Sequence, residues 1–525
     1  MPRSPVPLLP RFPADPVVMT LAARVRMRPV LYPAAIAAAY VLNLVVETEV
    51  SPYAATRPLI LAIVVGLALP WLGGLVAAQR DVAGLVGGLL LFVGVSAPSA
   101  AIVFLTCAAL VLIGVQRVLA RRRPKSRAAE ERVWRLATRA LTVAALVFLV
   151  AVGVKTVQLG RAESIAHDLV AEFPLRAGPA GIASAPADLP NMYLILLDGY
   201  PRADKLMSEF GIDVSWFTRG LEGRAFAVAS HSRSNHTATR VTLTQMFDYE
   251  PGIGSAGGNG GQDDLWRRRI NEGRFFDDIR GLGSEVFAVS PGFEHIALRQ
   301  ADRFIDTGQP NEFEWALLQV TGARVLVDSL RPELAADLAR ARVLDSFKAT
   351  EEIALEDSKS PRFVLTHIAG PHAPLIFERD GSPTLRRGMK LTVADGVEAS
   401  RLRWPEYVRR LEGQIGFLSA RTLDLVDRII DRDPEAVIVV FSDHGSGVRD
   451  APNDPGAVDA DLRTANLLAV RSPGRTGIID DRSTLANLLP RLLRAYAGIG
   501  PPDVPETIYV SADHPEVTRV FERPD

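Results

Sequence analysis

Long apolar stretches without charged residues dominate the first part of the chain. The longest of them, residues 82–116, is interrupted by the polar sequence SAPS at 96–99. A single helix needs about 20 apolar residues to cross a bilayer, so this stretch predicts a hairpin of two helices. With the other stretches, the pattern predicts a membrane domain over residues 1–159. Its five spans are expected at 30–46, 58–79, 82–95, 98–117 and 136–159.

The charges between these stretches predict the orientation of the membrane domain. Five arginines precede residue 30, and the segment 117–135 (RVLARRRPKSRAAEERVWR) is densely basic. The loop at 47–57 carries two glutamates and one arginine. Lys and Arg concentrate in cytoplasmic loops, and with five spans both basic segments lie on that side. We therefore expect a multi-pass membrane protein with a cytoplasmic N-terminus and with everything after residue 160 outside.

The rest of the chain alternates between short apolar runs and helical patterns. Residues 160–190 contain RAGPAGIASAPADLP, whose Ala, Gly and Pro are typical of a linker. Over 191–525, helical patterns lie at 311–356 and 407–432, between runs typical of strands buried on both faces. Such alternation predicts an extracytoplasmic α/β domain with a mostly parallel sheet. The predicted strands are 192–197, 284–290, 362–368, 436–442 and 466–471.

Composition argues against a nucleic-acid partner and against disulfide bonds within the chain. Lys and Arg number 59 and Asp and Glu 60, so the formal net charge of −1 predicts no nucleic-acid partner. Cys107 is the single cysteine, so no disulfide can form within one chain. We expect the outer domain to be held together by its hydrophobic core.

Ionisable residues stand at the ends of three of the predicted strands. Asp198 follows the first, His367 and His372 lie at the end of the third, and Asp443-His444 follows the fourth. In open α/β sheets, ligands bind at the carboxyl ends of the strands. Taken alone, the Asp198-Gly199 pair is more typical of a turn than of a metal site. A single histidine after a strand is more typical of a surface position or of the core. Two ionisable groups beside an apolar strand are costly to bury unless they are paired or metal-bound, so the set favours a metal site.

The chemistry of these ligands limits the choice of metal. Aspartates and an imidazole suit one divalent metal, Zn²⁺ or Mn²⁺, with Mg²⁺ less favoured. A fourth ligand is expected in the sequence TATRVTLTQMF at 237–247, where a polar loop runs into the start of a predicted helix. A hydroxyl on a metal at a helix N-terminus is suited to attack phosphorus. For a lone threonine, simple N-capping is the alternative.

The order of these residues resembles the alkaline phosphatase and sulfatase superfamily. With the apolar N-terminal part, the chain resembles its membrane branch, the lipoteichoic acid synthases and the phosphoethanolamine transferases. The resemblance implies that Thr239 is the nucleophile and the fourth metal ligand, beside Asp198, Asp443 and His444. Asp198 stands where the transferases usually have Glu. There is no Cys-x-Pro-x-Arg sequence, so the formylglycine chemistry of true sulfatases is not expected.

The resemblance also implies which residues contact the substrate. His367 and His372 match a pair that contacts the transferred phosphate, and both are candidates for catalysis and for substrate binding. Asn235 is a further candidate, which either contacts the substrate or shapes the loop. No histidine follows Asp443-His444 within the next 60 residues, which disfavours a second metal.

These features predict a metal-dependent transferase of the cell envelope. It moves a phosphoglycerol or phosphoethanolamine substituent from a membrane lipid donor to a glycan or lipid acceptor, through a phosphothreonine intermediate. One alternative is an extracytoplasmic phosphodiesterase, phosphatase or sulfatase-like hydrolase that uses the same site. The other is a non-catalytic, membrane-anchored binding protein, against which the retention of Asp198, Thr239, Asp443 and His444 argues.

Overall fold

The chain divides into two compact units, described here separately. The first comprises Met1–Leu42 and Pro58–Gly153, and the second comprises Asn43–Arg57 and Val154–Asp525. The predicted spans at 82–95 and 98–117 and the predicted linker up to residue 188 lie outside the described residues. The computed structural model describes residues 32–48, 52–76, several residues between 139 and 154, 189–249, 262–320, 327, 329–384, 395–450, 458–511 and 517–521.

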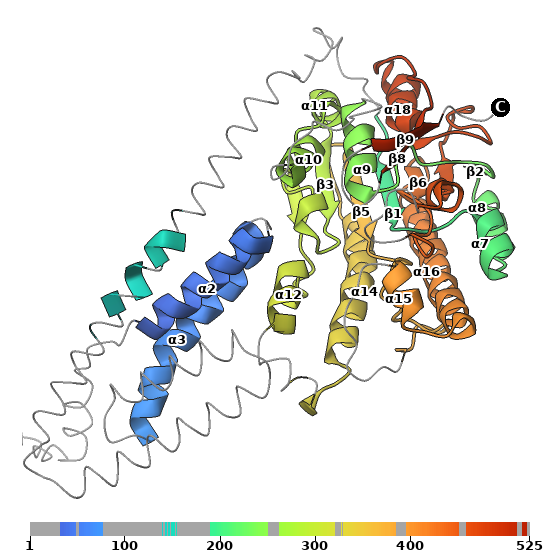
Figure 1. Ribbon diagram of the computed structural model, residues 1–525. Helices are drawn as coiled ribbons and strands as arrows, with labels where there is room; N and C mark the ends of the chain where they lie inside the picture. Colours follow the sequence, from blue (N-terminus) through green and yellow to red (C-terminus); the bar gives the residue numbers. More distant parts are fainter. Residues whose placement is uncertain are drawn as a thin grey trace, which may run out of the picture. The chain divides into compact units, whose positions relative to one another are not determined.

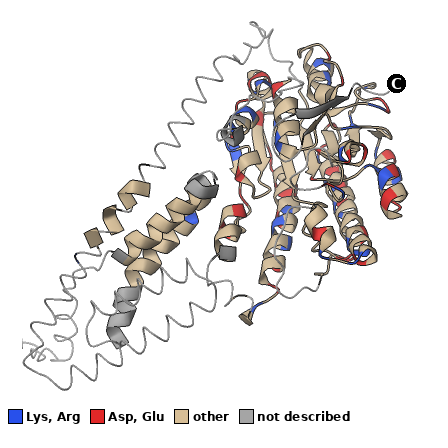
Figure 2. Cartoon of the chain, in the orientation of Figure 1, with Lys and Arg blue, Asp and Glu red and all other residues tan. Residues whose placement is uncertain are grey.

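Helices lie where the first two membrane spans are predicted. Helix α2 covers Tyr32–Thr48 and helix α3 covers Thr56–Val76, and the sequence of each contains a single charged residue. In Figure 2 the coloured parts of both helices are almost entirely tan, the colour of uncharged residues. The described residues between 139 and 154 are also helical. Among the described residues, no helix combines the length and the apolarity that a membrane crossing requires. The helical prediction is therefore confirmed at these places, and membrane insertion stays a prediction.

A seven-stranded mixed sheet forms the centre of the second unit in the described residues, in the order β2-β7-β6-β1-β5-β3-β4 (Figure 1). Strands β6, β1, β5, β3 and β4 are mutually parallel, whereas β7 runs antiparallel to both β6 and β2. The predicted, mostly parallel α/β sheet is thus confirmed. The strands are β1 Met192–Leu197, β2 Phe226–Val228, β3 Glu285–Val289, β4 Arg303–Ile305, β5 Arg362–Ile368, β6 Val437–Phe441 and β7 Leu468–Arg471; β8 Ile508–Ser511 and β9 Val517–Phe521 form a separate antiparallel pair.

Helices cover both faces of this sheet. Alternate residues of β1 enter different cores, with Tyr193 and Ile195 in one and Leu194 and Leu196 in the other. The first core contains residues of α7, α8, α14 and α16, and the second contains residues of α9, α10, α11 and α18. Burial on both faces explains why these strands are continuous apolar runs. The helices of this unit include α7 Ala203–Phe210, α8 Ser215–Glu222, α9 Thr239–Asp248, α10 Gln262–Asn271, α11 Arg274–Gly281, α12 Glu312–Val320, α14 Leu334–Leu355, α15 Asp395–Ser400, α16 Trp404–Arg432, α17 Ala460–Thr464 and α18 Leu488–Ala497.

The short segment before α3 belongs to the α/β unit. Ala54 is buried, and its carbonyl oxygen accepts a hydrogen bond from Asn311 Nδ2 at 3.0 Å. Arg57 donates to Glu314 Oε2 at 2.8 Å. The loop predicted to join the first two spans is therefore anchored to the segment around the start of α12.

Candidate metal centre

Three neighbouring strands bring ionisable side chains to one edge of the sheet. In the order β6-β1-β5, Asp443 and His444 follow β6, Asp198 follows β1, and His367 lies near the end of β5. Leu196 of β1 pairs with His367 on one side and with the last residue of β6 on the other, so these strand ends are level. The continuous apolar strands thus end at a common row of polar groups, as expected for the ligand-binding edge of such a sheet.

Three oxygen atoms surround the Nε2 atom of His444. The distance from Nε2 is 3.2 Å to Asp443 Oδ2, 3.4 Å to Thr239 Oγ1 and 3.7 Å to Asp198 Oδ1. Ligand atoms that bind one tetrahedral zinc at about 2.0–2.1 Å are separated from one another by roughly 3.3 Å. The structure therefore places one oxygen atom of each of the other three predicted ligands within 3.2–3.7 Å of His444 Nε2.

Two carboxylate oxygens of this cluster are buried without a partner. Among the described residues, Asp198 Oδ1 and Asp443 Oδ2 have no hydrogen-bond donor. Their companion oxygens are bonded: Asp198 Oδ2 lies 3.0 Å from His367 Nε2, and Asp443 Oδ1 accepts from the Gly199 N–H at 3.2 Å. Burying an unpaired carboxylate is expensive. A divalent cation removes that penalty, and this mixture of oxygens with one imidazole fits zinc or manganese.

The protonation state of His444 also suits a metal ligand. Burial, followed by the charge of Arg463, lowers the pKa of His444 to about 3, so the imidazole is neutral. Its Nδ1 lies 2.8 Å from the carbonyl oxygen of Gly445. A carbonyl can only accept, so the hydrogen is on Nδ1 and the lone pair is on Nε2.

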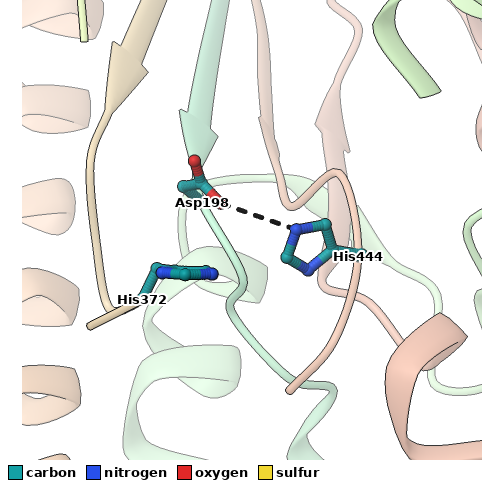
Figure 3. Close-up of side chains that lie close together, drawn as sticks. All are labelled: Asp198, His372 and His444. Carbon is teal, nitrogen blue, oxygen red and sulfur yellow. Dashed lines mark ion pairs between the residues drawn. The ribbon is translucent and has the colours of Figure 1, made fainter. Parts of the chain in front are cut away.

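His372 approaches the same centre from the loop after β5. Asp198, His372 and His444 each offer one ligand atom, and these atoms all lie within 4.8 Å of one another (Figure 3). Gly199 borders both rings, because a Cβ atom there would lie 3.1 Å from His372 Cδ2 and 3.4 Å from His444 Cε1. His372 is half-buried whereas His444 is buried, so His372 is the more accessible of the two rings.

His367 and Asn235, which are candidates for substrate contact, are both buried. His367 is 2% exposed, and its Nε2 atom faces the Asp198 carboxylate. Asn235 is fully buried; its Nδ2 donates to Thr507 O at 3.0 Å and its Oδ1 accepts from the Ala486 N–H at 2.9 Å. Both side chains are enclosed and each contacts protein groups, and their contact with a substrate stays a prediction.

Arg463 lies beside the centre, and the sequence contains no signal for it. Its Nε donates to the carbonyl oxygen of Thr237 at 2.8 Å, two residues before Thr239. Its own carbonyl oxygen accepts from the Gly445 N–H at 2.6 Å. The guanidinium group of Arg463 is therefore bonded to the Thr239 loop, and its backbone is bonded to the His444 loop. No motif marks the residue, because it is far from His444 along the chain and lies in the short helix α17.

Comparison with solved structures finds several similar proteins. The C-terminal periplasmic domain of EcEptC from Escherichia coli is 14% identical, with 64% of this chain and 93% of that chain covered and a TM-score of 0.39. The periplasmic domain of phosphoethanolamine transferase EptC from Campylobacter jejuni is 15% identical, with coverages of 58% and 89% and a TM-score of 0.36. The integral membrane protein lipooligosaccharide phosphoethanolamine transferase A from Neisseria meningitidis is 14% identical, with coverages of 89% and 95% and a TM-score of 0.37.

No protein-family model and no curated protein sequence matches the chain. The similarity to these solved structures is at low identity and low TM-score. What the chain does is therefore inferred below from its own residues.

Proposed function

We propose that this chain is an enzyme that transfers a phospho-substituent from a lipid donor to a glycan or lipid acceptor of the cell envelope. The substituent is of phosphoethanolamine or phosphoglycerol type. The supporting observation is that the Thr239 hydroxyl oxygen lies 3.4 Å from His444 Nε2, in a cluster with two buried, unpaired carboxylate oxygens. A nucleophile beside groups that can bind a divalent cation is an arrangement suited to phosphoryl transfer.

Four residues are proposed to hold one divalent metal, which is zinc or manganese by the choice of ligands. They are Asp198, Thr239, Asp443 and His444. When bound, the cation lowers the pKa of the threonine hydroxyl and offsets the negative charge of the phosphoryl group. Both effects favour attack on an anionic phosphodiester, which a neutral threonine performs poorly.

The proposed reaction has two half-reactions that share Thr239. In the first, Thr239 Oγ1 forms a bond to the phosphorus of the lipid while the bond from phosphorus to the glycerol oxygen breaks. The hydroxyl proton ends on that oxygen, so diacylglycerol leaves and a phosphothreonine remains. In the second, the acceptor hydroxyl oxygen forms a bond to phosphorus while the bond from phosphorus to Thr239 Oγ1 breaks, and the acceptor's proton returns to Oγ1. Thr239 is the first residue of α9, which has no side-chain cap, so the positive end of the helix dipole faces the transferred anion.

The neighbouring residues are proposed to divide the remaining tasks. His372, half-buried and next to the ligands, contacts a phosphoryl oxygen or protonates the leaving group. Arg463 adds a positive charge on the other side of the Thr239 loop. His367 bonds to Asp198 and acts as a positioning residue, because it fixes the direction in which the free oxygen of that carboxylate points.

The enzyme is proposed to act outside the cytoplasm, with five N-terminal spans that bring the site to its lipid donor. The distribution of basic residues supports a cytoplasmic N-terminus. The contacts of Ala54 and Arg57 with the α/β unit support a location of the loop 47–57 on the same side as that unit.

The test is to trap the intermediate on Thr239. The full chain in detergent with Zn²⁺ is incubated with phosphatidylethanolamine or phosphatidylglycerol without an acceptor, and the peptide with Thr239 is analysed by mass spectrometry. We expect the added mass of one phospho-substituent, which also identifies the donor. Thr239→Ala should abolish turnover, whereas Thr239→Ser, which keeps a hydroxyl, should retain a fraction of it. Unchanged turnover in Thr239→Ala refutes the mechanism.

Product analysis separates transfer from hydrolysis at the same site. With a glycan acceptor present, a transferase yields a modified glycan and diacylglycerol. A hydrolase yields the free phospho-compound at the same rate with or without the glycan. The proposed function predicts the first result.

A further inference from the structure

The loop that carries His372 is bonded to one buried glutamine of helix α16. Gln414 is 1% exposed, and its Oε1 accepts from the Ile376 N–H at 2.7 Å and from the Phe377 N–H at 3.3 Å. Its Nε2 lies 3.0 Å from Pro371 O, 3.2 Å from His372 O and 3.3 Å from Pro374 O. One side chain thus bonds to backbone groups on both sides of His372 and to His372 itself.

The composition of the loop explains why an external partner is needed. Pro371 and Pro374 have no N–H group, so the loop has two backbone donors fewer than carbonyl acceptors. Buried carbonyl groups without a donor are costly. A carboxamide supplies both donors and an acceptor in one plane, and the types of its backbone partners determine which end is oxygen.

Helix α16 approaches this loop closely enough for such contacts. A Cβ atom on Gly413 would lie 3.3 Å from Phe377 O, and one on Gly370 would lie 3.0 Å from Leu418 Cδ1. The opposite side of the loop is bonded to the metal centre, because the His372 N–H donates to the Asp198 carbonyl oxygen at 3.0 Å. The backbone of His372 is therefore bonded to Gln414 on one side and to a proposed metal ligand on the other.

We propose that Gln414 is the positioning residue that holds the His372 imidazole at the anion-binding face of the metal centre. The inference rests on the proposed function in assigning His372 to the phosphoryl group. Gln414 bonds to His372, which is proposed here to bind the phosphoryl group and not the cation, and none of its bonds goes to the four residues proposed to hold the metal. Its loss should therefore weaken anion binding and leave metal binding nearly intact, whereas an equal loss of metal binding would indicate that His372 is itself a metal ligand. A residue needed only for folding should instead weaken both.

The test is a double-mutant cycle in the full chain in detergent, loaded with Zn²⁺. Gln414→Met, His372→Ala and the double variant are compared, with calorimetry of inorganic phosphate and competition measurements of Zn²⁺ affinity. Thr422→Val is the matched control, because Thr422 is also fully buried on α16, and within the described part of the chain its hydroxyl bonds to Leu418 O of its own helix. If Gln414→Met does not fold, Gln414→Glu replaces it, since a carboxylate keeps the acceptor and loses the donors.

We expect Gln414→Met to weaken phosphate binding about tenfold, which is the order of effect expected from misplacing a binding group by a fraction of an ångström. Zn²⁺ affinity should change by less than about twofold, and in the His372→Ala background the glutamine substitution should add nothing further. Thr422→Val should leave both affinities unchanged.

Additive losses of phosphate binding, or an equal loss of Zn²⁺ affinity, overturn the inference. An absence of phosphate binding in the unsubstituted protein overturns it as well. Lipid-donor turnover is measured in parallel to separate the two hypotheses. Turnover without coupling between Gln414 and His372 removes the inference alone, and coupling without any turnover removes the proposed function alone.

Discussion

Adding one methyl group to Gly199 tests the geometry of the centre. Gly199 has φ +70°, a left-handed conformation that is unfavourable for alanine by about 1–2 kcal/mol. The new Cβ would lie 3.1 Å from His372 Cδ2, closer than ordinary van der Waals contact, so the ring must move by a few tenths of an ångström. We expect Gly199→Ala to lose about 1–2 kcal/mol of unfolding free energy and, separately, about tenfold in kcat/KM.

Gly211 provides a control with the same backbone strain. Its φ is +69°, and nothing lies within 4 Å of the position of a Cβ atom. Gly211→Ala should therefore lose a similar amount of stability with no effect on the site. Both variants are compared with the unsubstituted chain by thermal unfolding and by turnover of a lipid donor. If they lose stability equally and also keep equal activity, His372 is not constrained as the structure indicates and the reasoning is refuted.

Further predictions concern the metal ligands and their neighbours. Asp443→Asn should lower Zn²⁺ affinity by on the order of 100-fold or more, measured by competition with a chelator. The control is Asp427→Asn, which removes a carboxylate from a surface ion pair and should leave Zn²⁺ affinity unchanged. Equal Zn²⁺ affinities of the two variants would contradict the assignment of Asp443 as a ligand. His367→Ala should weaken Zn²⁺ binding by about 10–100-fold, and His367→Gln, which keeps an N–H donor, should restore part of it; no change excludes the positioning role. Arg463→Ala should lower kcat by about 100-fold at unchanged Zn²⁺ affinity, and a change in Zn²⁺ affinity alone would count against a role in charge stabilisation. Zn²⁺ at 100 times its Kd should stabilise the unsubstituted chain by about 2.7 kcal/mol in thermal unfolding and should have little effect on Asp443→Asn; equal stabilisation would mean that the metal binds elsewhere.

The local pattern of the sequence was sufficient for much of the α/β fold. The predicted strands 192–197 and 362–368 match β1 and β5 residue for residue, and 436–442 exceeds β6 by one residue at each end. A continuous apolar run bounded by polar residues is a local signal, and burial on both faces of a sheet makes it strong. The same signal does not indicate strand direction. The apolar run at 466–471 contains β7, which pairs antiparallel with β6.

The chemistry of the candidate ligands was also determined by the sequence. Asp198 and Asp443-His444 each end an apolar run, so their side chains were expected at one edge of the sheet. The threonine loop was not connected to them by any local pattern. Its assignment came from resemblance, and the 3.4 Å between Thr239 Oγ1 and His444 Nε2 depends on how α9 packs against the sheet.

Tertiary structure alone decided which residues lie beside the proposed ligands. His367 and His372 are five residues apart and look equivalent in the sequence, yet one is enclosed behind Asp198 and the other is half-exposed at the centre. Arg463 and Gln414 lie in helices without a distinctive motif. Arg463 contacts the Thr239 loop and Gln414 contacts the His372 loop through bonds between distant parts of the chain. Periodicity reports which face of an element is buried, whereas distances between elements follow from packing, and side-chain roles at a site depend on those distances.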